Sequence, residues 1–250
     1  MALSSVKGKW ALVLGASSGF GEAISLKLAE MGMHIAGVHM DRKSTLPHVE
    51  EVVQKIRAFG SKAVFFNVNA ADREKRAEVL EALTQHSQSV HCLVHSLAFG
   101  SLKPFITPEE KDRISPEQMN MTLDVMAHSL VYWTQDLFQR KMLPAGSRIF
   151  AMTSSGSTRV WPTYGAVSSA KSALESHCRQ LALELGAHAI AVNAVRAGVT
   201  DTPALRKIPG NEEMVAIASK RNPWRPTDHS RRCGQPSCFA GARRGPVANR

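Results

Sequence analysis

A short apolar run, followed by three closely spaced glycines and an amphipathic stretch, constrains the fold of this chain more than any other feature. Residues 9–14 read Lys-Trp-Ala-Leu-Val-Leu, and apolar residues recur at helical spacing from residue 23. This order predicts a strand, a tight turn and a helix. Glycines let the backbone approach a diphosphate, which binds the free N–H groups at the helix start. We therefore expect a dinucleotide site made by Gly15, Ser17, Ser18, Gly19, Phe20 and Gly21.

The rest of the chain repeats the alternation of apolar strand and helical stretch. We expect strands at residues 34–40, 62–68, 91–95, 148–153 and 192–195, and helices at 45–59, 72–86, 115–141 and from 164. This order predicts one domain, residues 1–223, with a parallel sheet, right-handed crossovers and helices on both faces. The fold class is α/β, a Rossmann-type doubly wound sheet. With 250 residues and 44% hydrophobic composition, the chain can bury a full core.

Composition argues against several other classes of protein. No stretch approaches the roughly 18 apolar residues of a membrane helix, and no secretory segment is visible, so we expect a cytoplasmic protein without membrane contact. Cys233 and Cys238 beside His229 match no zinc spacing, and we expect no metal. The net charge is +10, but residues 221–250 hold seven arginines and one acid. The body of the chain is therefore not basic enough to indicate a nucleic-acid partner.

The end of the second predicted strand bears on cofactor choice. A carboxylate at this point would select the free 2′-hydroxyl of NAD, but His39 stands there and Asp41 follows two residues later. Arg42 and Lys43 can pair with a 2′-phosphate, which favours NADP, and solvated turn charges are the alternative. We expect His39 and Arg42 to contact the cofactor.

Two further strand ends supply candidate cofactor contacts. Asn69 lies just past the third strand, where we expect it to contact adenine. Ser96 and Leu97 follow the fourth strand and are small or apolar enough to lie along the cofactor. His95, which precedes them, is interpreted as a packed residue rather than a catalytic base.

Tyr164 and Lys171 are the strongest candidates for chemistry. Seven residues make about two α-turns, so the side chains project from one side of a helix, about 10 Å apart along its axis. A nearby ammonium stabilises a phenolate, which makes the hydroxyl a better proton donor or oxyanion partner. Ser154 stands at the end of the fifth strand, where such sheets present ligands. These three residues are the predicted catalytic group, and Tyr164 and Lys171 should also contact the cofactor.

With these residues, the chain resembles the short-chain dehydrogenase/reductase superfamily over about residues 7–223. The resemblance also rests on residues 192–195 (Val-Asn-Ala-Val) and on Gly198 followed by Thr202. Most of that superfamily places its lysine four residues after the tyrosine, and the interval of seven here is similar to the enoyl-acyl-carrier-protein reductases. Residues 93–98 also resemble the enoyl-reductase version of the fourth strand. Met126 stands where ketone reductases carry an asparagine.

The runs 156–164 and 200–205 look closest to NADPH-dependent, soluble bacterial enoyl reductases. The resemblance implies reduction of the 2,3-double bond of an enoyl thioester of acyl-carrier protein or coenzyme A, in fatty-acid synthesis. Tyr164 would donate a hydrogen bond to the thioester oxygen, Lys171 would hold the nicotinamide ribose, and Ser154 would orient the carbonyl. Thr202 and the backbone of Val199 would fix the carboxamide.

The resemblance implies two further features. Residues 200–220 would form an amphipathic flap over the acyl chain, with ordinary core packing as the alternative. A homo-oligomer, dimer or tetramer, is expected if the C-terminus is complete. A 3-ketoacyl or other carbonyl reductase on the same fold is the alternative function, and a non-catalytic or damaged nucleotide-binding product is a second alternative.

Residues 224–250 depart from the family pattern. They are basic, rich in proline and glycine, and show no hydrophobic periodicity where a seventh strand is expected. With suitable codons, Thr227 to Gln235 read one base later spell Pro-Thr-Thr-Pro-Glu-Asp-Val-Ala-Asn, a plausible helix start. We therefore interpret this segment as an aberrant tail, disordered or frameshifted near Trp224, with the C-terminal strand missing.

Overall fold

The computed structural model describes residues 6–221 and contains a parallel six-stranded sheet in the order β3-β2-β1-β4-β5-β6. Strands are numbered along the chain, so the order reverses between β1 and β4, which creates a crevice at the carboxyl ends of these strands. The bounds are β1 (Trp10–Leu14), β2 (His34–His39), β3 (Ala63–Asn67), β4 (Cys92–His95), β5 (Arg148–Thr153) and β6 (Ala191–Arg196). The predicted Rossmann-type fold is confirmed.

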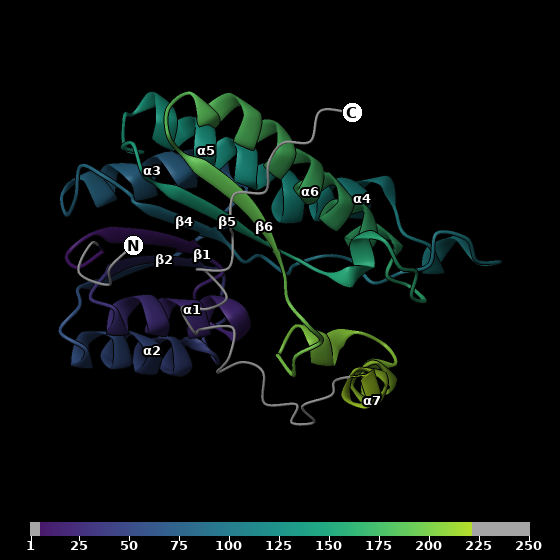
Figure 1. The fold of residues 1–250 in the computed structure, drawn as a ribbon. Coiled ribbons are helices and arrows are strands. Elements are labelled where there is room, and N and C mark those ends of the chain that lie inside the picture. Colours follow the sequence, from purple (N-terminus) through teal and green to yellow (C-terminus); the bar gives the residue numbers. More distant parts are fainter. Residues whose placement is uncertain (1–5, 222–250) are drawn as a thin grey trace.

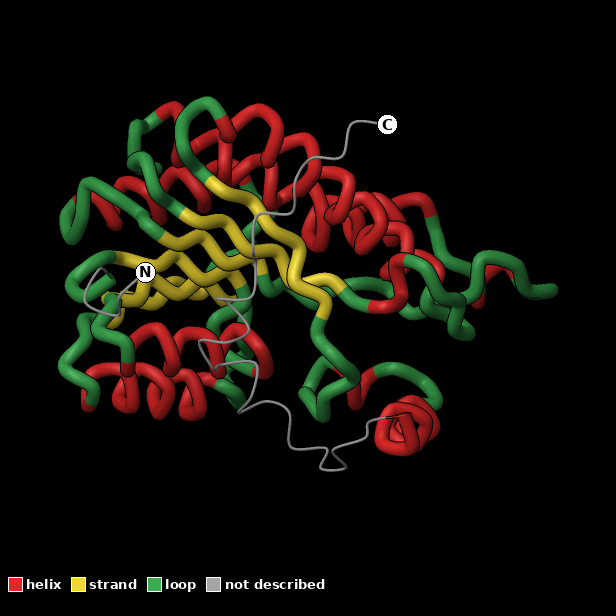
Figure 2. Tube along the Cα trace, viewed as in Figure 1, coloured by secondary structure: helices red, strands yellow, loops and turns green. Residues whose placement is uncertain are grey.

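Helices cover both faces of the sheet (Figure 1). The helices are α1 (Gly19–Glu30), α2 (Leu46–Ala58), α3 (Arg73–Thr84), α4 (Pro116–Leu123), α5 (Ser129–Gln139), α6 (Gly165–Gly186) and α7 (Asn211–Arg221). α1 and α2 lie on one face and α3 to α6 on the other, as Figure 2 shows with the strands between two helical layers. α7 follows the end of β6 and lies apart from both layers.

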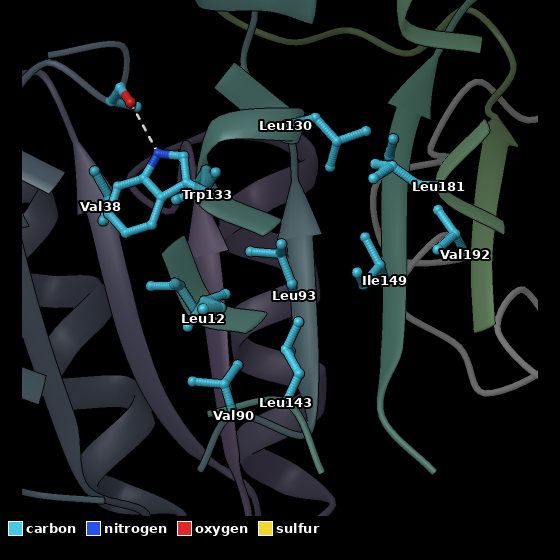
Figure 3. Close-up of a cluster of buried hydrophobic side chains, with 14 of the residues drawn as sticks. Leu12, Val38, Val90, Leu93, Leu130, Trp133, Leu143, Ile149, Leu181 and Val192 are labelled. Atoms are coloured by element: carbon cyan, nitrogen blue, oxygen red, sulfur yellow. Dashed lines mark hydrogen bonds between the residues drawn. The ribbon is translucent and has the colours of Figure 1, made fainter. Parts of the chain in front are cut away.

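The core is divided by the sheet because the central strands are apolar on both faces. β1 is buried along its whole length, as expected for a parallel strand between two helical layers. Figure 3 shows the larger cluster, in which Leu12, Leu93 and Ile149 of three neighbouring strands meet Leu130 and Leu181 of the helices. The indole N–H of Trp133, buried there, donates to the Ala70 carbonyl at 2.8 Å. This core fixes the strand ends that carry the site.

The predicted helix at 115–141 is correct as a helical run but wrong as a uniform one. α4 and α5 are joined by a π-helical segment, η3 (Asp124–His128). In η3 the carbonyl of Val125 accepts a hydrogen bond from the Ser129 hydroxyl at 2.7 Å, and that hydroxyl also bonds the buried His95 ring at 2.8 Å. These bonds to a strand-end histidine occur where the helix widens, and apolar periodicity alone does not reveal them.

Within residues 6–221, no strand pairs with the outer edge of β6. The predicted absence of a C-terminal strand concerns residues 224–250 and stays a prediction. The segment 224–250, with its proposed frameshift and with Cys233 and Cys238, lies outside the described residues. None of the helices within residues 6–221 combines the length and apolar character that a bilayer span requires.

Candidate active site

The glycine turn between β1 and α1 is packed so tightly that side chains are excluded. Gly15 has φ +84°, and a Cβ there would collide with the Ser96 carbonyl of the loop after β4. A Cβ on Gly21 would collide with the Gly15 carbonyl. The turn therefore brings bare backbone and the start of α1 to the sheet crevice, which is the cradle that a dinucleotide diphosphate requires.

The serines of the turn have different surroundings. Ser17 is buried and lies near enough to the Asp41 carboxylate to help lower its pKa, whereas Ser18 is exposed as the residue preceding α1. Phe20 packs against the core cluster under α1. Ser18 is thus the serine of the turn that faces solvent, and Ser17 connects the turn to the end of β2.

At the end of β2, His39 lies behind Asp41 rather than on the surface. Its ring is buried, and Nδ1 lies 3.0 Å from Asp41 Oδ2. Burial lowers the pKa of His39, against the opposing effect of Asp41. Burial acts to raise the pKa of Asp41, but hydrogen bonds from Ser17, Thr45 and His39 outweigh it and hold that pKa below its ordinary value. His39 can therefore reach a cofactor only through Asp41, while Arg42 is exposed beside it.

Sequence reasoning missed Asn67, the last residue of β3. Its side chain accepts from the Asp41 amide at 2.9 Å and donates to the Asp41 carbonyl at 3.0 Å, which fixes the loop after β2. The predicted Asn69 is exposed and accepts from the Ala71 amide at 3.0 Å, a local turn bond. Asn67 had a usable signal, since it directly ends a strand at the carboxyl edge of the sheet.

Tyr164 and Ser154 are brought together across a glycine. Tyr164 caps α6, and its side chain lies beside that of Ser154, the residue after β5. A Cβ on Gly156 would lie 2.5 Å from the Tyr164 ring and 3.1 Å from Ser154 Oγ, so glycine is required for this approach. Burial raises the pKa of Tyr164, although the bond to Ser154 acts in the opposite direction. The phenol therefore stays protonated and available as a donor.

Lys171 is buried and points to the sheet. Its ammonium donates to the Met152 carbonyl at 2.8 Å and to the Leu97 carbonyl at 3.3 Å. Burial lowers the pKa of Lys171 to about 8. We expected Lys171 to lower the pKa of Tyr164, but the group that does so is Ser154, and burial outweighs it. Lys171 instead joins β5 to the loop carrying Ser96 and Leu97, beside the glycine turn.

A carboxylate that sequence reasoning missed supports Ser154 from behind. Oε1 of Glu175 accepts from Thr153 at 2.7 Å, from Ser157 at 2.8 Å and from Arg196 at 3.1 Å. Burial acts to raise the pKa of Glu175, but these donors lower it below its ordinary value. Thr153 and Ser157, which lie on either side of Ser154 in the sequence, are therefore held by one ionised group on α6. No local motif reveals this contact between distant segments.

His95 is confirmed as a packed residue. Its ring is fully buried beside Ser129, and burial lowers its pKa to about 3, with the nearby Lys171 acting in the same direction. A neutral imidazole with so low a pKa is not a proton donor at neutral pH. Met126 is buried too, and a Cβ on Gly100 would lie 3.0 Å from its sulfur. The residues beneath the site are therefore apolar or neutral.

The segment after β6 covers the glycine turn. Thr202 is buried, and a Cβ on Gly19 would lie 3.3 Å from its methyl group. Val199 is half-buried in the same loop. The predicted flap contains a 3₁₀ turn, η5 (Leu205–Lys207), and α7, and none of its apolar residues Leu205, Ile208, Met214, Val215 and Ile217 is buried. They therefore do not pack as ordinary core.

This arrangement is that of a nicotinamide-dependent reductase, with a diphosphate cradle on one side of the crevice and a protonated phenol on the other. A family model described as enoyl-(acyl carrier protein) reductase matches residues 15–240. The chain therefore belongs to this family of the short-chain dehydrogenase/reductase superfamily and is an NAD(P)-dependent oxidoreductase. The match extends beyond residue 223, where we expected the resemblance to end.

Similar proteins include, by name, a trihydroxynaphthalene reductase, a 3-oxoacyl reductase and an enoyl reductase. The chain is 28% identical to trihydroxynaphthalene reductase PfmaI of Pestalotiopsis fici over 90% of this chain and 79% of that protein. It is 28% identical to 3-oxoacyl-[acyl-carrier-protein] reductase FabG of Pseudomonas aeruginosa, over 82% of this chain and 79% of that protein. The solved enoyl-[acyl-carrier-protein] reductase (NADH) of Aquifex aeolicus superposes with a TM-score of 0.79 and is 24% identical. The superposition covers 95% of this chain and 90% of that chain, which shows a shared fold.

Proposed function

We propose that this chain reduces the 2,3-double bond of an enoyl thioester, carried by acyl-carrier protein or coenzyme A, with NADPH. The family match is the broad support, and Tyr164 is the specific one. Its raised pKa and its position beside Ser154 suit a phenol that donates a hydrogen bond and keeps its proton. Reduction at the double bond needs such a donor, because negative charge develops on the thioester oxygen when the hydride adds to C3; the resulting enolate then takes its proton at C2 from solvent water.

The described residues fit a nicotinamide cofactor. Gly15 and Gly21 leave no room for side chains at the turn, which suits a bound diphosphate, and Ser96, Leu97 and Thr202 line the same crevice. When bound, the cofactor supplies the hydride. Lys171 is proposed for the nicotinamide ribose, and the two backbone carbonyls that hold its ammonium between β5 and the Leu97 loop support this role. Thr202 and Val199 are proposed for the carboxamide.

NADPH is the proposed form of the cofactor. The Asp41 carboxylate already engages Thr45 at 2.8 Å and His39 at 3.0 Å, which reduces its capacity to accept from a ribose 2′-hydroxyl. Arg42 and Lys43 are exposed beside it, and no ion pair within residues 6–221 includes either. Their charges suit a 2′-phosphate.

An apolar acyl chain suits the loop after β4. Phe99 and Phe105 are each 48% exposed and Ile106 is 90% exposed. Phe105 reaches α6, since a Cβ on Gly165, next to Tyr164, would lie 2.5 Å from its ring. Exposed apolar side chains beside the phenol provide a surface for an aliphatic substrate.

A homo-oligomer remains part of the proposal.

The buried Met126 also favours an enoyl substrate. Reduction of a ketone delivers a proton to the oxygen, and the donor must then be reprotonated through polar groups. The Met126 thioether, on η3 and next to the Gly100 loop, offers no such group, and His95, with its low pKa, is not an acid at neutral pH. A 3-ketoacyl or other carbonyl reductase is the competing proposal, supported by the names of the two relatives.

Oxidation of NADPH by the purified chain distinguishes these proposals. We expect turnover with a crotonyl thioester and at least tenfold slower turnover with the matching acetoacetyl thioester. Turnover of the keto substrate alone would establish the competing function. NADH in place of NADPH provides the cofactor comparison in the same assay.

A further inference from the structure

The chain reaches Tyr164 through a strained turn. The Tyr164 amide donates to the Trp161 carbonyl at 3.1 Å, with Pro162 second and Thr163 third in the four-residue turn. Thr163 has φ +62°. Proline followed by a residue with positive φ defines a type II turn, in which glycine is the favoured third residue. A β-branched threonine there is strained, so other contacts must hold the turn.

Trp161 provides such a contact from the first position of the turn. Its indole N–H donates to the Pro209 carbonyl at 2.9 Å, 48 residues away. A Cβ on the next residue, Gly210, would lie 3.1 Å from the indole ring, and Gly210 has φ +75°. The Gly210 carbonyl in turn accepts from the amides of Glu213 and Met214 at the start of α7. The turn before Tyr164 is thus in direct contact, through Trp161, with the residues at which α7 begins.

The other end of this segment lies on the glycine turn. Thr202 faces Gly19, its hydroxyl accepts from the Leu205 amide at 3.1 Å, and its carbonyl accepts from the Arg206 amide at 3.1 Å. Residues 202–210 therefore extend from the diphosphate cradle to Trp161. The two halves of the site are connected through this segment as well as through the sheet.

We infer that Trp161 is a positioning residue, which holds the turn that orients Tyr164 and links it to the 202–210 segment over the glycine turn. The inference rests on the proposed function only for the choice of assay substrate, because Tyr164 is the hydrogen-bond donor for either thioester. A misplaced phenol weakens an interaction made in the transition state, so the expected defect is in kcat rather than in KM.

Two substitutions break the contact from opposite sides. Trp161→Phe keeps an aromatic ring but removes the donor, and Gly210→Ala keeps the donor but pushes the ring away. Each should lower kcat about tenfold, with NADPH affinity changed less than twofold. The double variant should be no worse than the worse single variant, because both act on one contact. Val160→Ala is the same-loop control, since Val160 is 97% exposed, and it should match the wild type.

A rescue separates positioning from general destabilisation. Glycine adopts positive φ without strain, so Thr163→Gly should restore most of the kcat lost in Trp161→Phe. Wild-type kcat in both single variants, or no recovery in the rescued variant, would overturn the inference.

The choice of substrate is tested separately. If the wild type reduces only the acetoacetyl thioester, the proposed function fails and the same variants are scored with that substrate. If it reduces neither, hydrogen exchange of the α7 amides decides. Trp161→Phe should then speed exchange about tenfold at residues 211–221, and unchanged exchange would overturn the inference.

Discussion

The glycine turn and the Tyr164 region are built in opposite ways, although they face each other across one crevice. At the glycine turn, backbone packs on backbone, and a Cβ on Gly15 or Gly21 would meet carbonyl groups directly. Around Tyr164, side chains do the positioning, through Ser154, Glu175 and the indole of Trp161. The first region tolerates almost no change of residue, whereas the second can be altered in steps. Substitutions should therefore cause abrupt failure on one side and graded loss of rate on the other.

Tyr164→Phe should give the largest loss of rate. Removing one hydrogen-bond donor from a developing oxyanion costs roughly 10²–10³ in kcat, about 3–4 kcal/mol. Because the phenol lies outside the glycine turn, NADPH affinity should change by less than about threefold. Stopped-flow rates and NADPH titration measure both quantities. A loss of NADPH binding equal to the loss of rate would show that the two regions are not separable.

Gly21→Ala tests the opposite region. The added methyl group would collide with the Gly15 carbonyl, and the backbone must shift to accommodate it. We expect about 1–3 kcal/mol lower unfolding free energy and about hundredfold weaker NADPH binding. Gly186→Ala is the matched control, because that glycine is also helical and nothing lies within 4 Å of the position. If both variants bind NADPH equally, backbone packing does not form the cradle.

Arg42→Ala should affect the cofactor more narrowly. Losing one charge near a 2′-phosphate should raise the KM for NADPH about tenfold and leave that for NADH unchanged. Arg57→Ala, an exposed arginine on α2, is the control and should change neither constant. Equal effects on the two cofactors would remove the argument for NADPH.

Glu175→Gln should give a graded loss on the side-chain-built half. The amide keeps one acceptor oxygen but loses the charge that holds Thr153, Ser157 and Arg196, so we expect about fivefold lower kcat. In the wild type, the pKa of Glu175 in the folded chain is lowered from its ordinary value of 4.5. The ionised carboxylate therefore stabilises the fold above pH 4.5, and this stabilisation is lost as the pH falls through the folded-state pKa.

Denaturant unfolding at pH 7 and at pH values below 4.5 measures this contribution. The wild type should lose stability faster than Glu175→Gln as pH falls through that range. Glu184→Gln, exposed on the same helix, should behave like the wild type in both rate and pH dependence. Equal acid sensitivity of all three proteins would show that the Glu175 carboxylate does not stabilise the fold.

The pH dependence of Lys171 should be the smallest effect on stability. Its pKa in the folded chain is about 8, below the ordinary 10.5, so the unfolded chain binds more protons between these values and stability rises with pH there. Between pH 8 and 9 this amounts to about 1 kcal/mol. Turnover should fall over the same interval as the ammonium is lost. Lys171→Met should remove the stability rise, and an unchanged rise would assign it to another group.

The same contrast explains how much could be predicted from the sequence. Residues 9–21 combine an apolar strand, glycines and a helix start, which are local features, so the β1–turn–α1 unit and the parallel, doubly wound sheet could be predicted. The Tyr164–Ser154 pairing was predicted from strand-end position and spacing. Glu175, Asn67 and Trp161 were missed because the partners of their side chains lie 18 or more residues away along the chain. The π segment at 124–128 was missed because apolar spacing continues through it.

A competition between two substrates tests the central proposal most directly. The chain would receive equal amounts of crotonyl and acetoacetyl thioesters with NADPH deuterated at the transferable position, and mass spectrometry would locate the label. We predict butyryl thioester with deuterium at C3 as the main product. Labelled 3-hydroxybutyryl thioester without butyryl thioester would contradict the proposed function.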